Sequence, residues 1–286
     1  MATATTASPI FGDKLYQERA RAAFPLLVRQ AEAAVPVYYS SLAGELGMPN
    51  PRNLNYVLGC IGQTIEALSK RRKERIPPIQ CLVVNKASGL PGEGIGWFLV
   101  KKEEFSDLPL KRRREIVQAE LQHVYSYPHW REVLAELELK PVNLNFSPLV
   151  RSASAFRGGG EGPEHRALKE FVAANPTAIG LPATTPAGDV EFPVASGDCL
   201  DVYFRTRSLS IAAEIKSARS NVADLTRGIF QCVKYRAVLE ATLVSEGRPP
   251  NARAILVVGG TMPADLVSLV NLLGVEFVQC VSGEQG

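Results

Sequence analysis

Histidine and closely spaced cysteines are scarce in this chain. The three histidines form no H-x-x-x-H pair, and the five cysteines are scattered without a C-x-x-C pair. Neither a zinc site nor a disulfide framework is therefore expected. If a metal ion binds, oxygen ligands have to hold it, and such ligands favour Mg²⁺ or Mn²⁺.

The sequence also lacks long hydrophobic runs. No stretch of about 18 apolar residues occurs, so no membrane span is predicted. The N-terminal segment MATATTASPIFGDK has neither the basic start nor the apolar centre of a signal peptide. We therefore expect a cytoplasmic protein with no membrane partner.

The composition is that of a globular protein with room for two domains. Of the 286 residues, 46% are hydrophobic and 21% are charged, which is ordinary for folded domains. The net charge of +3 is unevenly divided, because residues 1–157 are net basic and the remainder is net acidic. A basic half suits binding to a polyanion and an acidic half suits holding cations. The alternative is that a basic excess of this size carries no function.

A serine- and glycine-rich stretch, RSASAFRGGGEGPEH, predicts the domain boundary. It begins at Arg151 and contains three consecutive glycines, a composition typical of flexible linkers. We therefore predict a first domain over residues 1–150, a linker over 151–160 and a second domain over 161–286.

Helical apolar spacing dominates the first part of the chain. It predicts a helix over residues 14–35 and a shorter one over 38–48. A longer amphipathic helix over 50–75 has Asn50 as a plausible cap and Pro51 in its first turn. Two helices joined by a short glycine-containing turn form the helix-turn-helix pattern.

Residues 76–100 contain an apolar stretch, a turn rich in glycine and proline, and a second apolar stretch, which predicts a β-hairpin. Three helices followed by a hairpin give this half a mainly helical fold that resembles winged helix-turn-helix DNA-binding domains. The resemblance implies that the helix beginning at Pro51 enters the major groove of DNA. Its exposed side chains near the start would contact bases or phosphates: Arg52, Asn53, Asn55 and Tyr56.

A basic run, SKRRKER, closes the same predicted helix. Lys70, Arg71 and Arg72 offer contacts to phosphates. The alternative is a solvated helix end, at which the same residues would have no nucleic-acid partner.

The second half alternates between helix and strand patterns. It predicts a helix over 162–176, strands within 189–206 and 209–217, a long helix over 221–247, and a strand, helix and strand over 252–282. This order indicates an α/β fold in which helices flank a mixed sheet.

One strand ends on an acid and a base, in the sequence AAEIKS. Glu214 and Lys216 are two residues apart, so their side chains point to the same side of a strand. Asp201 opens the preceding strand and can lie close to Glu214. Two neighbouring carboxylates repel each other unless a cation or a proton lies between them, and Mg²⁺ suits such a pair. The alternative is a solvated strand end.

With its surroundings, this stretch resembles the PD-(D/E)XK nuclease superfamily, whose members share the restriction-endonuclease-like fold. The resemblance covers about Gly160 to Val281. It rests on four features in order: Glu164 on the first helix, Asp201 in GDCLDVYF, Glu214 and Lys216 in AAEIKS, and Gln231 and Tyr235 in RGIFQCVKYR. One departure is Leu200, where the family often has proline, and Asp198 competes with Asp201 for the aspartate position.

The resemblance implies Mg²⁺-dependent hydrolysis of a DNA phosphodiester, with Mn²⁺ able to substitute. Asp201, Glu214 and the Ile215 carbonyl would hold the metal, with help from Glu164. Lys216 would orient the attacking water. The alternative for Glu164 is an acid favoured only by the dipole at the start of its helix.

The predicted helix that follows the strand carries the remaining family residues. Gln231 would contact the DNA backbone or border the site. Tyr235 shares its helix face and is expected to contact DNA. Both could instead be ordinary residues of the helix surface and the core. His165 is expected to be structural or to face solvent.

The leading hypothesis is a restriction or defence endonuclease, whose first domain reads double-stranded DNA. A homodimer is plausible because cutting both strands usually takes two active sites. Repair or recombination nucleases share the chemistry. A non-catalytic DNA-binding regulator and a protein-interaction module are the alternatives of other classes.

Overall fold

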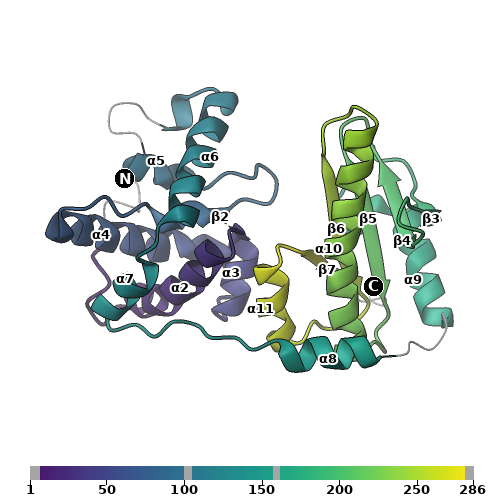
Figure 1. Cartoon of the computed structure of the whole chain (residues 1–286), viewed down its shortest axis with the longest axis horizontal. Coiled ribbons are helices and arrows are strands. Elements are labelled where there is room, and N and C mark those ends of the chain that lie inside the picture. The colour runs from purple at the N-terminus through teal and green to yellow at the C-terminus, as the bar shows by residue number, and fades with distance from the viewer. Residues whose placement is uncertain (1–6, 100–104, 157–161, 281–286) are drawn as a thin grey trace. The chain divides into compact units, whose positions relative to one another are not determined.

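The computed structural model describes residues 7–99, 105–156 and 162–280 (Figure 1). The chain forms two compact units, Met1–Leu144 and Asn145–Gly286. In the described ranges, no helix has the length and apolar content needed to cross a membrane.

The first unit is mainly helical, as predicted. Helix α2 (Leu15–Glu32) packs on helix α4 (Leu54–Arg72). The other helices are α3 (Tyr39–Glu45), α5 (Gly96–Leu99), α6 (Leu110–Ser126) and α7 (Trp130–Glu136). Short 3₁₀ helices and two short strands complete the unit: η1 (Pro51–Asn53), η2 (Ile79–Leu82), η3 (Glu93–Ile95), η4 (Phe105–Asp107), β1 (Val37–Tyr38) and β2 (Val83–Val84).

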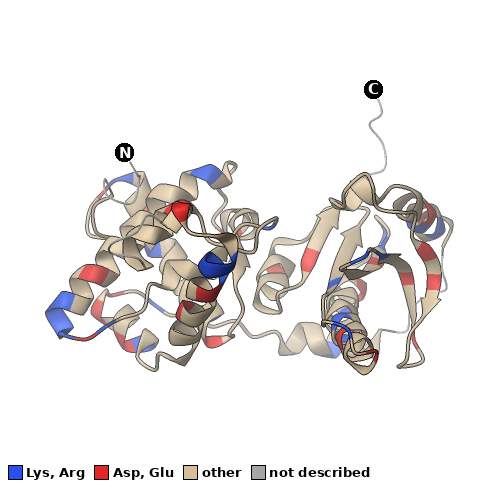
Figure 2. Ribbon diagram, turned by 90° about the horizontal axis from the view of Figure 1, so that it is seen from above, with Lys and Arg blue, Asp and Glu red and all other residues tan. Residues whose placement is uncertain are grey.

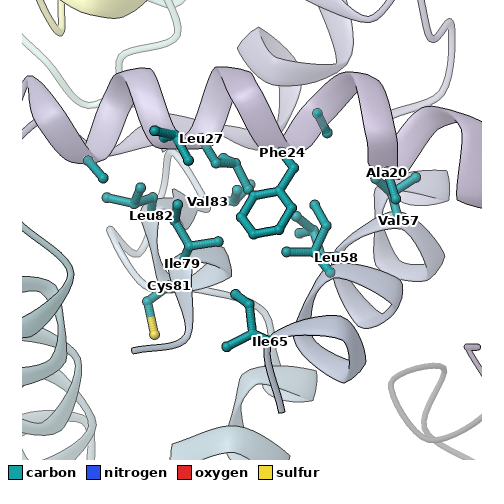
Figure 3. Close-up of a cluster of buried hydrophobic side chains, with 14 of the residues drawn as sticks. Ala20, Phe24, Leu27, Val57, Leu58, Ile65, Ile79, Cys81, Leu82 and Val83 are labelled. Atoms are coloured by element: carbon teal, nitrogen blue, oxygen red, sulfur yellow. The ribbon is translucent and has the colours of Figure 1, made fainter. Parts of the chain in front are cut away.

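The core of this unit follows from the apolar spacing of its two long helices. Ala20, Phe24 and Leu27 recur at helical intervals on α2 and are fully buried. They pack with Leu58 and Ile65 of α4 (Figure 3). Full burial of one large apolar side chain contributes about 1.5–3 kcal/mol. The packing of α2 on α4 is therefore central to the stability of this unit.

The start of the long helix agrees with the sequence. The Asn50 side chain accepts a hydrogen bond from the backbone N–H of Arg52 at 3.0 Å, and Pro51 occupies the first turn. Helix α4 ends at Lys73, whose φ of 55° is left-handed. Asn50 is therefore confirmed as the cap of this segment.

The predicted hairpin is wrong for the described part of residues 76–100. Its first apolar stretch forms η2 and the two-residue strand β2, and its second forms η3 and α5. Strand β2 pairs in parallel with β1 and with no later segment of this stretch. Ile79 and Val83 are fully buried, so the apolar run indicates burial in the core rather than a hairpin. The wing of the expected winged helix is absent from these described residues.

The second unit is built on a five-stranded mixed sheet, as the sequence predicted. Its strand order is β3-β4-β5-β6-β7. Neighbours β3, β4 and β5 pair antiparallel, whereas β5, β6 and β7 pair parallel. The strands are β3 (Asp189–Pro193), β4 (Cys199–Arg205), β5 (Ser210–Lys216), β6 (Ala252–Val258) and β7 (Glu276–Gln279).

Helices cover both faces of this sheet (Figure 1). Along β5, Ala212 faces the cluster with helix α10, while Ile211 and Ile215 face the cluster with helix α9. This alternation is the period of two expected of a strand buried on both faces. The helices are α9 (Pro163–Ala174), α10 (Val222–Ser245) and α11 (Ala264–Leu272), with the 3₁₀ helix η5 (Pro176–Ile179).

The predicted linker is partly helical. Helix α8 (Ser147–Ala155) includes its first five residues, Arg151–Ala155, and belongs to the second unit. Phe146 and Leu149 are three residues apart, so both reach the cluster beneath α10. The packing of these two apolar side chains favours a helix here, although the neighbouring serines and glycines are typical of a linker. Residues 157–160 of the predicted linker lie outside the described ranges.

Leu149→Ala should lower the free energy of unfolding of the second unit by about 1–2 kcal/mol, because it removes apolar contacts of a partly buried side chain. Val150→Ala on the same helix is the matched control, since Val150 is exposed. Hydrogen exchange of the β5 and β6 amides measures the effect. Equal protection in the two variants would show that α8 does not stabilise this unit.

Candidate active site

A pocket of about 730 Å³ opens within the second unit. It is lined by the start of α9, parts of β3 and β4, the end of β5 and the first half of α10. Asp201, Glu214, Lys216, Gln231 and Glu164 all line it. The structure therefore brings together every side chain predicted for the catalytic and metal site.

Strand pairing explains how the two acids meet. Val202 lies opposite Ala213, so the next position along the register places Asp201 across from Glu214. Cross-strand neighbours point to the same face of a sheet. The backbone ladder stops at Val202, and the Asp201 Oδ2 atom accepts the Ile215 N–H at 2.8 Å beyond it. The carboxylate thus fixes the end of β5.

Asp201 is held as a carboxylate. Burial alone would raise its pKa, but the His165 ring and the Ile215 N–H favour the charged form, so the pKa lies below its ordinary value. The His165 Nε2 atom is 3.6 Å from Asp201 Oδ1. His165 therefore lines the pocket, because the first turn of α9 reaches the edge of the sheet, and its contact with Asp201 is compatible with the structural role expected from the sequence.

Glu214 is the acid whose ionisation is disfavoured. Its side chain is 4% exposed. Burial, and then repulsion by Asp201, raise its pKa to about 7, despite the attraction of Lys216. A cation beside both carboxylates would remove the repulsion and favour ionised Glu214.

Lys216 remains an ammonium group. Its Nζ atom lies 3.0 Å from Glu214 Oε1 and 3.1 Å from Asp224 Oδ1. Burial lowers its pKa, but the two carboxylates outweigh burial, and the pKa is raised above its ordinary value. Lys216 can therefore donate hydrogen bonds and stabilise negative charge, but it is not suited to accept a proton.

The sequence alone did not identify two residues that place this lysine. Asp224 lies in the first turn of α10, where its N–H donates to the Asn221 side chain at 3.0 Å. The Asn-x-x-Asp spacing, typical of a helix start, is the one signal that marks it. A Cβ atom at Gly228 would lie 2.7 Å from Lys216 Cε and 2.9 Å from Leu256 Cδ1. The missing side chain leaves room for Lys216.

Gln231 and Tyr235 form a connected pair on α10. Gln231 Nε2 donates to Tyr235 Oη at 3.1 Å, and Tyr235 Oη donates to the Cys199 carbonyl at 3.4 Å. Tyr235 is only 4% exposed and packs in the core. Its burial agrees with the alternative of a core residue, and the DNA contact stays a prediction. Gln231 Oε1 is buried and accepts no hydrogen bond among the described residues.

The remaining acids near the site have partners of their own. Glu164 Oε1 lies 2.7 Å from Arg219 Nη2, so the predicted ligand is held by an arginine. Asp198, the competitor of Asp201, is bound by Lys234 at 2.7 Å. Asp198 does not line the pocket described here, which favours Asp201 as the site aspartate.

The DNA-contacting residues predicted in the first unit fall into two separate groups. Basic and acidic positions are interspersed on the ribbon of this unit (Figure 2). One exposed group lies at the start of α4, and the other lies at its end, about 25 Å away. The groups are Arg52, Asn53, Asn55 and Tyr56, and then Lys70, Arg71 and Arg72.

Two acidic side chains pair with the three basic side chains of the second group. Arg71 and Arg72 both pair with Glu136, and Lys70 pairs with Glu66 at 3.0 Å. This agrees with the alternative of a solvated helix end. The exposed group at the start of α4 remains a predicted DNA contact.

The donor set of the pocket fits a single hard cation. In the described ranges, no group of three or more His, Cys, Asp or Glu side chains is arranged to hold a metal. Mg²⁺, however, often binds through one or two carboxylates, with water and phosphate oxygens completing its shell. Asp201 and Glu214 supply those two carboxylates. The buried, unpaired Gln231 Oε1 could accept a hydrogen bond from a metal-bound water.

Comparisons with known proteins do not identify a function for the site, so the proposal below rests on this geometry. No protein-family model, curated protein or solved structure matches the chain.

Glu214→Gln should stabilise the metal-free protein more at pH 8 than at pH 5. The folded-state pKa of about 7 lies above the ordinary 4.5, so the folded protein holds a proton that the unfolded chain releases between these values. The stability that this carboxyl gives at low pH is therefore lost as the pH rises through 7, by up to about 3 kcal/mol. Glutamine does not titrate.

Urea unfolding in the presence of a chelator measures this difference. A stability difference between Glu214→Gln and the unsubstituted protein that stays constant from pH 5 to pH 8 would contradict the raised pKa.

Proposed function

We propose that this chain is a metal-dependent DNA endonuclease that hydrolyses phosphodiester bonds at the pocket of the second unit. The observation that carries the proposal is the pair of carboxylates on adjacent strands, partly buried Asp201 and buried Glu214, beside the ammonium group of Lys216. A divalent cation would relieve the repulsion between these carboxylates, and the cation and Lys216 would together attract a phosphate.

Each residue has a separate role in the proposed reaction. Asp201, Glu214 and the Ile215 carbonyl would hold Mg²⁺, or Mn²⁺ in its place. The bound ion would supply an activated water and stabilise charge on the phosphate. Lys216 stays protonated, so it would orient the attacking water and donate to the developing negative charge. Gln231 would accept a hydrogen bond from a water in the same pocket.

The topology supports a restriction-endonuclease-like fold for this unit. An acid-bearing helix precedes the sheet, an antiparallel pair of strands presents Asp201 and the Glu-x-Lys sequence, and α10 follows with Gln231. This is the order on which the resemblance to PD-(D/E)XK nucleases rests. Glu164 would join the metal through water after leaving Arg219, and His165 already lies beside Asp201.

A restriction or defence nuclease is the setting that we propose. Double-stranded DNA would be contacted by the exposed start of α4, through Arg52, Asn53, Asn55 and Tyr56. Two copies of the chain would serve to cut both strands. A repair or recombination nuclease would use the same site. A non-catalytic regulator is disfavoured by the repulsive acid pair, since binding DNA without cleavage gives no physical reason to bury Glu214 beside Asp201.

Asp201→Asn and Lys216→Met should each reduce Mg²⁺-dependent cleavage of a plasmid by about 100-fold or more, because the first weakens the hold on the metal and the second removes a positive charge from the reacting phosphate. Asp198→Asn is the matched control. It changes a partly exposed aspartate three residues from Asp201 and outside the lining of the pocket, so cleavage should persist.

Gel electrophoresis of the nicked and linear products, with and without a chelator, measures this comparison. Cleavage by Asp201→Asn at the rate of the unsubstituted protein would exclude this site. DNA binding without cleavage in either Mg²⁺ or Mn²⁺ would favour the regulator.

Gly228→Ala should reduce cleavage at least tenfold while the protein remains folded. Alanine favours a helix by about 1 kcal/mol over glycine, but its Cβ would meet Lys216 Cε at 2.7 Å and displace the ammonium group. Gly44→Ala, in helix α3, meets no atom within 4 Å and is the control. Full activity in Gly228→Ala would show that the position of Lys216 is not critical.

A further inference from the structure

The charged side chains of the pocket are almost completely paired. Five basic and five acidic side chains line it. His165, Lys216 and Arg219 have the acidic partners described above, and Lys169 Nζ lies 3.0 Å from Glu191 Oε1. These contacts engage all five acids, because Lys216 binds two of them.

Arg227 is the basic side chain left over. It is exposed at the pocket, and it has no acidic partner in the part of the chain that the structure describes. Asp224 is three residues away on the same helix, the spacing at which an Asp–Arg ion pair is ordinarily formed. Instead, Asp224 binds Lys216 at 3.1 Å. The same contact that holds Lys216 therefore leaves Arg227 without its local partner.

Helix α10 places Arg227 in line with the site. Asp224, Arg227 and Gln231 are spaced i, i+3 and i+7, so they share one helix face. All three line the pocket. Along this face, Arg227 lies between the aspartate that holds Lys216 and the unpaired Gln231 Oε1.

We propose that Arg227 binds a phosphate of the substrate next to the phosphate that is cleaved. This proposal rests on the proposed nuclease function and deepens it. The substrate class is then a polynucleotide chain, because an isolated phosphodiester carries no second phosphate for Arg227 to bind.

The chemistry of the side chain favours this ligand. A guanidinium group presents a planar fork of donors that matches two phosphate oxygens, and it stays charged at any working pH. Lys216 is committed to the carboxylates at the reacting phosphate, so its charge is not available to a neighbouring one. Arg227 supplies that second positive charge at the mouth of the same pocket.

The test compares Arg227→Ala with Arg207→Ala in the full-length protein. Arg207 is also exposed and without an acidic partner in the described ranges, but it lies in the turn between β4 and β5, at the opposite end of these strands from the site. Cleavage of a DNA oligonucleotide duplex is measured with Mg²⁺ over a range of salt concentrations. Hydrolysis of bis(4-nitrophenyl) phosphate, an isolated phosphodiester, is measured in parallel.

Arg227→Ala should raise KM for the duplex about tenfold, with a smaller change in kcat, and should lower the slope of log KM against log salt by about 0.9, the loss of one phosphate contact. The loss of kcat/KM that Arg227→Ala causes with the isolated phosphodiester should be several times smaller than its loss with the duplex. Arg227→Lys should recover part of the affinity, and Arg207→Ala should match the unsubstituted protein.

Equal KM values and salt slopes for Arg227→Ala and Arg207→Ala, in a protein that cleaves DNA, would overturn this inference and leave the nuclease function standing. Equal losses of kcat/KM by Arg227→Ala with the duplex and with the isolated phosphodiester would also overturn it. A lack of metal-dependent cleavage by the unsubstituted protein would overturn both.

Discussion

The repulsion between Asp201 and Glu214 is the constraint that determines the arrangement of charged groups in the pocket of the second unit. Strand register forces the two carboxylates together, and the burial of Glu214 limits screening by water. The neighbouring groups compensate: Ile215 and His165 stabilise the charge of Asp201, while Lys216 attracts Glu214. What remains is a raised pKa of Glu214, and a bound cation, as we propose, would remove its cause.

The packing of helices on the sheet forms a pocket around these two carboxylates. The sheet fixes the acids, and α10 packs on the same face, so its first turns meet the end of β5. Asp224 forms an ion pair with Lys216, and the absence of a side chain at Gly228 leaves room for the lysine. Helix α9 covers the other face, and its first turn brings His165 to Asp201. Rigid elements therefore hold every proposed catalytic group, which suits a site that has to keep its geometry while charge develops.

Local patterns were sufficient to predict much of this arrangement. Alternating helix and strand periods gave the order of the second unit, and the spacing of Glu214 and Lys216 placed them on one face. Contacts between distant segments were not predictable. The apolar pair Phe146 and Leu149 made a helix of a segment with a linker-like composition, and burial replaced the expected hairpin around Ile79. His165, Asp224 and Gly228 act through partners on other elements, so no local pattern revealed their roles.

The most direct test of the central claim is the carboxyl titration of Glu214 by NMR, in the absence and presence of Mg²⁺. The account predicts a pKa of about 7 without the metal and a value below the ordinary 4.5 with it, because a bound cation reverses the effect of Asp201. Asp201→Asn should lower the metal-free value by removing the repulsion. A Glu214 pKa that Mg²⁺ leaves unchanged would contradict the claim that these two carboxylates form a cation site.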